Sequence, residues 1–563
     1  MRMTSILAAA VISSVAAMSA AFAQQPQNPP ATASATQPQS YWSLVRTSDP
    51  ADLAVYRDAN AKLPPPAAGE ERVVFLGDSI TENWQRTFPQ NYPNRPNYIG
   101  RGRTSETTFQ MLIRFRPDIV NLHPKVVVIM AGVNDVAGNT GAETDEQIHD
   151  NFVSMFDIAR ANGIKVILVS TLPATNFFWQ PGIDGASQRV KKLVGWEKEY
   201  AASHGLFFVD AFDTFKDEKD GMPATYSSDT VHPNALGYQL LSGMVEAQIQ
   251  NALGHEVTGV TPAPATVPAP DQPARGFGGR GGGRGGGGAG RTPVPAPTPT
   301  PMADLGMPIP AGALPIRTPG PGQNLSYVPP ADIAPPIVGS SGRGPSDPYW
   351  IAAIQADPAD LKVYQKANAL IGAPKPGENR VVFLGDSIIE KWQPLFAASF
   401  PGKSSYVGRG IPAETTMQML VRFRPDVIDL GAKVVVLQGG IGDIAGNTGD
   451  VPDATIHDNF AAILDLARVN NIKVVWISTL PASRLFWQPS VDPIKRVADL
   501  AQWEKDYAAT NGVQFVDAYS ALLTQSGGLI RTYSDDGVHP NAAGYAVLSP
   551  MVEKAIEQTL TSK

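Results

Sequence analysis

The sequence of 563 residues contains no cysteine. This absence excludes disulfide bonds, thiolate nucleophiles, cysteine-ligated zinc and iron–sulfur clusters. Charged residues are also few, at 17%, and the net charge is −7. A chain with this balance is not expected to bind nucleic acid generally or to present a strongly basic face to a membrane. Glycine (52) and proline (51) are abundant beside 43% hydrophobic residues, which indicates folded domains combined with low-complexity segments.

The first residues are typical of a secretory signal peptide. Arg2 precedes the apolar run Ile6–Met18, and Ala21-Phe22-Ala23 supplies the small-x-small pattern that signal peptidase cleaves. An uncleaved membrane anchor is the alternative, but the run is short for a span of about 20 residues. We therefore expect residues 1–23 to be removed, with no stable membrane insertion, and the protein to be exported to the periplasm or the exterior.

A long segment of the sequence occurs twice. Val73–Ile80 recurs as Val381–Ile388, 308 positions later, and the same spacing carries Arg114–Asp118 onto Arg422–Asp426. Each copy has the size of one domain, so the repeat indicates duplication of a whole domain. The predicted division is a disordered lead-in (24–40), domain 1 (41–253), a linker (254–345) and domain 2 (346–563).

The segment between the copies has a different composition. Runs of Pro-Ala-Pro and Thr-Pro-Thr-Pro flank a Gly/Arg tract at 275–291. Such a segment has too little apolar surface to offset chain entropy, so we expect a disordered Pro/Gly-rich linker. Arginine–glycine tracts can bind single-stranded nucleic acid, but four arginines in an acidic exported protein favour a linker able to contact anionic cell-wall material.

Within each copy, short apolar runs alternate with helical patterns. The runs of the first copy are rich in β-branched residues and predict five buried parallel strands, at 72–76, 98–99, 126–130, 165–170 and 206–209. Helical patterns lie between them, at 107–115, 144–161 and 188–204. This alternation predicts the α/β class, with a three-layer α/β/α sandwich and a five-stranded parallel sheet in each copy. Ligands of such sheets bind at the carboxyl ends of the strands.

Ser79 follows the first predicted strand, after Gly77 and Asp78, and begins a predicted helix that runs through Trp84. A serine at this place has its hydroxyl in the crevice and its backbone N–H at a helix start, which suits an anion. An ordinary helix cap is the alternative interpretation. The second copy repeats the arrangement at Ser387.

A serine nucleophile needs a base, and the histidines narrow the choice. Of seven, only two pairs occupy matching places in the copies, His149/His457 and His232/His539. His149 lies in an amphipathic helix, where a solvated side chain is expected. His232 follows Asp229 by three residues, and that carboxylate can accept the imidazole Nδ1–H and fix its tautomer. Asp536 stands before His539 in the same way, and a helix N-cap is the alternative role for both pairs.

Charge stabilisation of a tetrahedral intermediate has two further candidates. Gly102 follows the second strand and offers an unhindered backbone N–H, and Asn134 follows the third strand and offers a side-chain amide. With the N–H of Ser79 they would form an oxyanion hole of three donors. A tight turn for the glycine and an Asx-turn for the asparagine are the alternatives.

The order Gly-Asp-Ser, Gly, Gly-x-Asn-Asp, Asp-x-x-His resembles the SGNH (GDSL) hydrolase superfamily of esterases and lipases, over nearly all of each copy. The resemblance implies Ser79 as nucleophile, His232 with Asp229 as the rest of the triad, and Gly102 and Asn134 as oxyanion donors. It also implies a flavodoxin-like sandwich and neither a metal nor another cofactor. The Asn-Arg-Gly frequent in the family is Gly-Arg-Gly in this chain, ending at Gly102.

The second copy departs from this pattern at one position. Gly442 stands where the first copy has Asn134, whereas Ser387, Gly410 and the pair Asp536 and His539 remain. Loss of one oxyanion donor typically costs about 10²–10³ in kcat. Domain 1 is therefore predicted to be the main catalyst, and domain 2 to be slow, altered in substrate or mainly a binding domain.

The residues and the resemblance together predict an exported serine esterase. Short-acyl esters, including carbohydrate O-acetyl groups, are expected by family analogy, so the partner is a small-molecule or polysaccharide ester and not nucleic acid. Two tryptophan pairs are candidates for the walls of a sugar or acyl pocket or for simple packing, Trp84/Trp392 and Trp179/Trp487. The alternative is a tandem polymer-binding protein with two hydrolase-like domains on a flexible tether.

Overall fold

The computed structural model describes residues 49, 51–175, 177–180, 183, 185–255, 357 and 359–562. The predicted signal peptide and lead-in, the start of each domain and nearly all of the predicted linker lie outside these residues. Within the described ranges, none of the helices combines the length and the apolar composition that crossing a membrane would require.

Domain 1 is built on five parallel strands in the order β2-β1-β3-β4-β5. Their bounds are β1 (Val73–Gly77), β2 (Tyr98–Gly102), β3 (Val126–Met130), β4 (Lys165–Val169) and β5 (Phe207–Val209). Gly77 pairs with Gly102 on one side and with Met130 on the other, so the carboxyl ends of β1, β2 and β3 are level. The order of strands along the chain reverses at β1 and β3, which is where ligands bind in such sheets.

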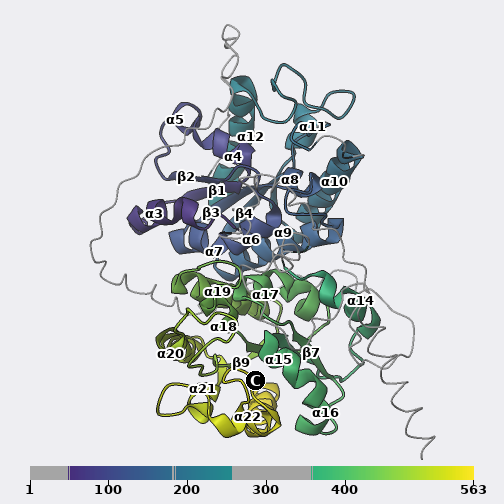
Figure 1. Ribbon diagram of the computed structural model, residues 1–563. Helices are drawn as coiled ribbons and strands as arrows, with labels where there is room; N and C mark the ends of the chain where they lie inside the picture. Colours follow the sequence, from purple (N-terminus) through teal and green to yellow (C-terminus); the bar gives the residue numbers. More distant parts are fainter. Residues whose placement is uncertain are drawn as a thin grey trace, which may run out of the picture. The chain divides into compact units, whose positions relative to one another are not determined.

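Helices cover both faces of this sheet. Figure 1 shows α12 and α4 on one side of the strands and α9 and α6 on the other. The helices of domain 1 are α3 (Ala54–Lys62), α4 (Ser79–Gln85), α5 (Phe88–Asn91), α6 (Thr108–Ile113), α7 (Phe115–Asp118), η1 (Val120–Leu122), α8 (Val133–Val136), α9 (Asp145–Ala161), α10 (Ala186–His204), α11 (Ala211–Phe215) and α12 (Ala235–Leu253). The predicted α/β/α sandwich is confirmed.

Domain 2 repeats the same architecture, with strand order β10-β9-β8-β6-β7. Its strands are β6 (Val381–Gly385), β7 (Tyr406–Gly410), β8 (Val434–Gln438), β9 (Lys473–Ile477) and β10 (Gln514–Val516). Its helices are α14 (Lys362–Ile371), α15 (Ser387–Trp392), η2 (Gln393–Leu395), α16 (Phe396–Ser399), α17 (Thr416–Phe423), η3 (Arg424–Ile428), α18 (Ile441–Ile444), α19 (Asp453–Val469), α20 (Ile494–Thr510), α21 (Ala518–Leu522), η4 (Arg531–Tyr533) and α22 (Ala542–Thr561).

The predicted helix at 107–115 is the one element that the structure divides. It ends at Ile113 and a short second helix, α7, begins at Phe115. Pro117 explains the break, because it has no N–H to donate to the carbonyl of Ile113 and its ring crowds that carbonyl. Arg114 lies at the junction and is fully buried, where its guanidinium pairs with Glu106 and Asp118.

The core holds the helix that begins at Ser79 in place. Trp84 is 0% exposed; its indole N–H donates to Ser242 Oγ of α12 and its ring stacks on Tyr238 of the same helix. Trp392 of domain 2 is equally buried. Trp84 and Trp392, one of the two tryptophan pairs that were candidates for pocket walls, therefore belong to the core. Trp84 fixes α4 against α12.

Candidate active site

In domain 1, His232 lies within hydrogen-bonding distance of both Ser79 and Asp229. The hydroxyl of Ser79 is 2.9 Å from His232 Nε2, and His232 Nδ1 is 2.7 Å from Asp229 Oδ2. The three side chains come from two segments that are about 150 positions apart in the sequence. Their arrangement is that of a serine nucleophile, a base and a carboxylate that orients the base.

The loop that carries His232 is held by hydrogen bonds from its backbone N–H groups to the side chain of Asp229. The second oxygen of Asp229 accepts the backbone N–H of Val231 (2.9 Å) and of His232 (2.7 Å). This tight loop requires a left-handed residue, Thr230, with φ of 71°. Domain 2 has glycine, Gly537, at the matching place (φ 84°), where that conformation carries no steric cost.

Helix α12 connects the histidine loop to the serine. Asn234, two residues after His232, caps this helix, because its side-chain oxygen accepts a hydrogen bond from the N–H of Gly237 (3.0 Å). The hydroxyl of Tyr238, one turn along, donates to the carbonyl of Ile80 in α4 (2.9 Å). The same packing that buries α12 therefore sets the distance between imidazole and hydroxyl.

Two carboxylates determine the charge of the histidine. Burial alone would lower the pKa of His232, but the hydrogen bond and charge of Asp229, with the nearby Asp78, outweigh it and raise that pKa above 6.5. Burial would raise the pKa of Asp229, but its hydrogen bonds from His232 and Val231 hold it well below its ordinary value. Burial raises the pKa of Asp78 to about 7. Asp229 is therefore ionised and stabilises an imidazolium.

Domain 2 assembles the same triad. Ser387 Oγ is 2.8 Å from His539 Nε2, and His539 Nδ1 is 2.6 Å from Asp536 Oδ2. The hydroxyl of Tyr545 donates to the carbonyl of Ile388, as its counterpart does in domain 1 (2.7 Å). The same arrangement of serine, histidine and aspartate is thus present in both copies.

Asn134 lies at the start of α8, directly after β3, and is 2% exposed. Its Nδ2 donates to the carbonyl of Glu106 (2.9 Å), and its Oδ1 accepts a hydrogen bond from Asn139 Nδ2 (2.9 Å). An amide nitrogen carries two N–H groups, so Asn134 has one N–H beyond the one that Glu106 accepts.

The structure places Gly102 and Gly410 differently from the expectation. Each lies inside a strand, and a Cβ at Gly102 would be 2.1 Å from the backbone nitrogen of Glu82. The next residue, Arg103, donates its N–H to β1 (2.9 Å to Gly77 O), so the Gly102 N–H points to the opposite side. In domain 2 the N–H of the matching residue, Gly410, donates to Gln393 Oε1 (2.9 Å). The two glycines serve the close approach of helix and strand.

The turn that contacts Asn134 is instead formed by Ser105 and Glu106. Ser105 has φ of 66°, and its carbonyl accepts a second bond from Asn139 (3.1 Å). Sequence reasoning missed both Ser105 and Asn139. The sequence did contain a signal for Asn139, because the four residues Gly138–Gly141, which include it, recur unchanged as Gly446–Gly449 in the second copy.

Domain 2 has lost more than the asparagine side chain. A Cβ on Gly442 would lie 2.1 Å from the carbonyl oxygen of Glu414, so the neighbouring turn occupies the space of the side chain. Gln438 of β8 is a different amide from the one lost: with its nitrogen toward Asp386, it donates to Asp386 Oδ1 (3.0 Å) and its oxygen accepts the N–H of Gly439 (3.2 Å).

An exposed phenylalanine lies beside His232 and beside His539. Phe178 is 56% exposed and its ring centroid is 6.4 Å from that of His232; Phe486 is 50% exposed and 6.1 Å from His539. Trp179, a predicted pocket wall, is partly buried and packs edge-to-face against Phe178. The exposed ring, which the sequence did not single out, is the aromatic surface beside the triad.

His149 and His457 form the other matching pair, and the prediction of a solvated side chain is wrong for them. His149 stacks on Trp196 of α10 with ring centroids 4.0 Å apart, and burial lowers its pKa to about 4. His457 stacks in the same way on Trp503. Among the residues that the structure describes, none of the groups of three or more His, Asp and Glu side chains could hold a metal ion.

Comparisons with known proteins give one family. The model of the GDSL-like lipase/acylhydrolase family matches residues 75–240 and 383–547. A presumed acylhydrolase of Bacteroides fragilis NCTC 9343 has a solved structure with 42% identity, covering 37% of this chain and 99% of that chain (TM-score 0.36). A GDSL-like lipase of Bacteroides thetaiotaomicron VPI-5482 has 40% identity, covering 36% and 98% (TM-score 0.35).

A curated relative matches over a shorter stretch. The uncharacterized lipoprotein YqeF of Bacillus subtilis (strain 168) is 30% identical over 124 residues, which are 19% of this chain. The match spans 50% of that relative's length.

Proposed function

Because the chain belongs to the GDSL-like lipase/acylhydrolase family, we propose that domain 1 hydrolyses carboxylic esters with Ser79 as nucleophile, His232 as base and Asp229 as its orienting carboxylate. The observation that carries this proposal is the distance of 2.9 Å from Ser79 Oγ to His232 Nε2, with Asp229 on the opposite nitrogen of the ring. The proposal includes export, which is supported by the N-terminal apolar run and its small-x-small pattern.

The reaction has two steps. His232 takes the proton of Ser79 while the hydroxyl oxygen attacks the ester carbonyl, and the free N–H of Asn134 with the N–H of Ser79 stabilises the oxyanion. His232 then protonates the departing alcohol, which leaves an acyl group on Ser79. A water molecule, deprotonated by the same histidine, attacks this acyl group and releases the acid.

The pH dependence should follow His232. The base must be neutral, so activity falls as the pH drops through its pKa; Asp229 and Asp78 raise that pKa above 6.5. The acid limb of kcat/KM, which reports the free enzyme, should therefore have its midpoint above 6.5. A profile measured with a chromogenic acetyl ester, whose hydrolysis involves no ionisable substrate group, checks this. A limb at or below 6.5 would show that the two carboxylates do not govern the base.

For domain 2 we propose little turnover, because its triad lacks the amide partner. Restoring the side chain by Gly442→Asn should not create activity in a Ser79→Ala chain, since the new Cβ meets the carbonyl of Glu414 at 2.1 Å. The variant should instead lose thermal stability. Ester turnover and melting temperature of S79A and S79A/G442N, compared side by side, test this; a gain of turnover would mean that one side chain accounts for the difference between the domains.

The proposed substrates are esters with a short acyl group, including acetyl groups on carbohydrates. Phe178 supports a ring-shaped alcohol, because its exposed face lies beside His232 and can stack on an aryl or sugar ring. Phe178→Ala should raise KM for aryl acetates and acetylated sugars several-fold and leave kcat nearly unchanged, since the contact forms with the bound substrate.

Phe486→Ala is the matched control for that prediction. It removes an equally exposed ring in domain 2, where little turnover is expected, so the steady-state constants should hardly change. Equal effects of the two substitutions would contradict the assignment of Phe178 to substrate binding and would give domain 2 a share of the turnover.

A further inference from the structure

We propose that Asn139 is a positioning residue that sets which way the amide of Asn134 faces. This inference rests on the proposed function, in which that amide stabilises the oxyanion. The oxygen and nitrogen of an amide are similar in size, so their order is decided by the groups around them. Only the orientation with nitrogen toward the strand ends gives the oxyanion a donor.

The contacts of Asn139 select that orientation. Its Nδ2 donates to Asn134 Oδ1 (2.9 Å) and to the carbonyl of Ser105 (3.1 Å). Its backbone N–H also donates to the carbonyl of Asn134 (3.1 Å). With its oxygen bound to Asn139, the amide turns its nitrogen to Glu106, whose carbonyl takes one N–H, and keeps the other for the ligand.

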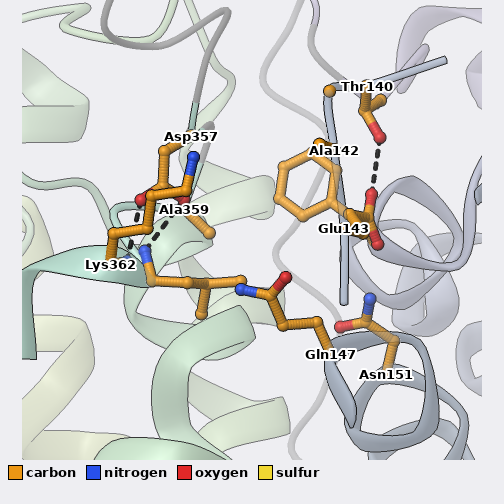
Figure 2. A pocket seen from close by; sticks show the side chains of 11 residues that line it. Thr140, Ala142, Glu143, Gln147, Asn151, Asp357, Ala359 and Lys362 are labelled. Carbon is orange, nitrogen blue, oxygen red and sulfur yellow. Dashed lines mark hydrogen bonds between the residues drawn. The ribbon is translucent and has the colours of Figure 1, made fainter. Parts of the chain in front are cut away.

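Asn139 is itself held on two sides. Its Oδ1 accepts the indole N–H of Trp179 (3.0 Å), which lies on the segment after β4. The turn that contains Asn139 is closed by the N–H of Gly141, which donates to the carbonyl of Gly138 (3.0 Å). The hydroxyl of the next residue, Thr140, donates to Glu143 (2.7 Å), as Figure 2 shows. Because Asn139 is 9% exposed, water has little access to compete for these bonds. A chain of hydrogen bonds thus runs from Trp179 through Asn139 to Asn134.

Domain 2 keeps this turn without the group that it would orient. Asn447 donates to the carbonyl of Ala413 (2.8 Å) and accepts the indole N–H of Trp487 (3.0 Å). Its backbone N–H donates to the carbonyl of Gly442 (3.0 Å), where no side-chain amide exists. The bonds that hold the turn are therefore common to both domains, and the bond to an amide is present in domain 1 alone.

Asn139→Ala removes the donor that holds the amide oxygen and leaves the carbonyl of Glu106 as the other partner, so the amide of Asn134 should be held less firmly. We expect kcat to fall by more than about tenfold and by less than the 10²–10³-fold of losing the donor outright. KM should change little, because the oxyanion exists in the transition state and not in the bound ester. A double variant tests the coupling: in an N134A chain, adding N139A should cost nothing further in kcat.

The experiment compares N139A, N134A, N134A/N139A and N447A in the full chain carrying Ser387→Ala, which removes any turnover by domain 2. N447A breaks the same two side-chain bonds of the turn and is the structural control. A loss of melting temperature is expected in both N139A and N447A, somewhat larger in N139A because the bond to Asn134 is also broken, with a fall in kcat in N139A alone. The inference is overturned if N139A keeps the kcat of its parent, or if the losses of N134A and N139A multiply in the double variant. If the parent chain, which carries only Ser387→Ala, has no ester turnover, the proposed function itself is wrong. This outcome is distinguishable from the two that overturn the inference about Asn139.

Discussion

Replacing Ser79 by alanine should lower ester turnover of the full chain by at least about 10²-fold, because domain 1 then lacks the atom that forms the acyl intermediate and domain 2, with one oxyanion donor fewer, supplies only about 10⁻²–10⁻³ of the turnover. In domain 1 the remaining oxyanion donors and the histidine could then act only by direct attack of water on the ester, without the acyl intermediate. The fall should appear in kcat and kcat/KM alike. Initial rates on p-nitrophenyl acetate, with melting temperature as the check of folding, measure it.

Ser387→Ala is the matched control. It removes the same hydroxyl from a triad with the same geometry, 2.8 Å from its histidine, in a domain without the amide. Most of the turnover should survive this change. If S79A keeps most of the activity and S387A loses it, domain 2 is the catalyst and the oxyanion argument is wrong.

Replacing Asn134 by alanine should lower kcat by about 10²–10³-fold with little change in KM. The side chain is 2% exposed and makes its contacts through the amide, so the loss falls on a donor that acts when charge develops on the carbonyl oxygen. Steady-state kinetics on one short-acyl ester separate the two constants.

The Asn134 prediction has two contrary outcomes. A rise in KM at constant kcat would make Asn134 a ground-state contact of the substrate. An unchanged kcat/KM would remove it from the reaction and, with it, the explanation for a weak domain 2.

The strands were predictable because they depend on local pattern. Val73–Leu76 is a β-branched-rich apolar run and is fully buried in β1, as such runs in parallel sheets are. The helix at 107–115 was predicted as one piece because the spacing of apolar residues does not register the effect of one proline. Pro117 overrides that spacing by removing one donor and crowding one carbonyl.

The triad was predictable for a different reason. Asp229 and His232 are joined by a short loop, so their pairing is nearly a local property, and the sheet topology brings the loop to Ser79. The direction of the Gly102 N–H depends on strand register, which a sequence does not display. Asn139 and Phe178 act through contacts with distant segments and belong to no periodic pattern.

The most direct measurement is labelling of the full chain with a fluorophosphonate probe, which phosphonylates a serine only where a base activates it, followed by mapping of the modified peptide by mass spectrometry. We expect rapid modification of Ser79, loss of that modification in His232→Ala, and slower modification of Ser387. A chain that hydrolyses esters while Ser79 stays unlabelled, or that is labelled equally fast without the imidazole of His232, would contradict this expectation.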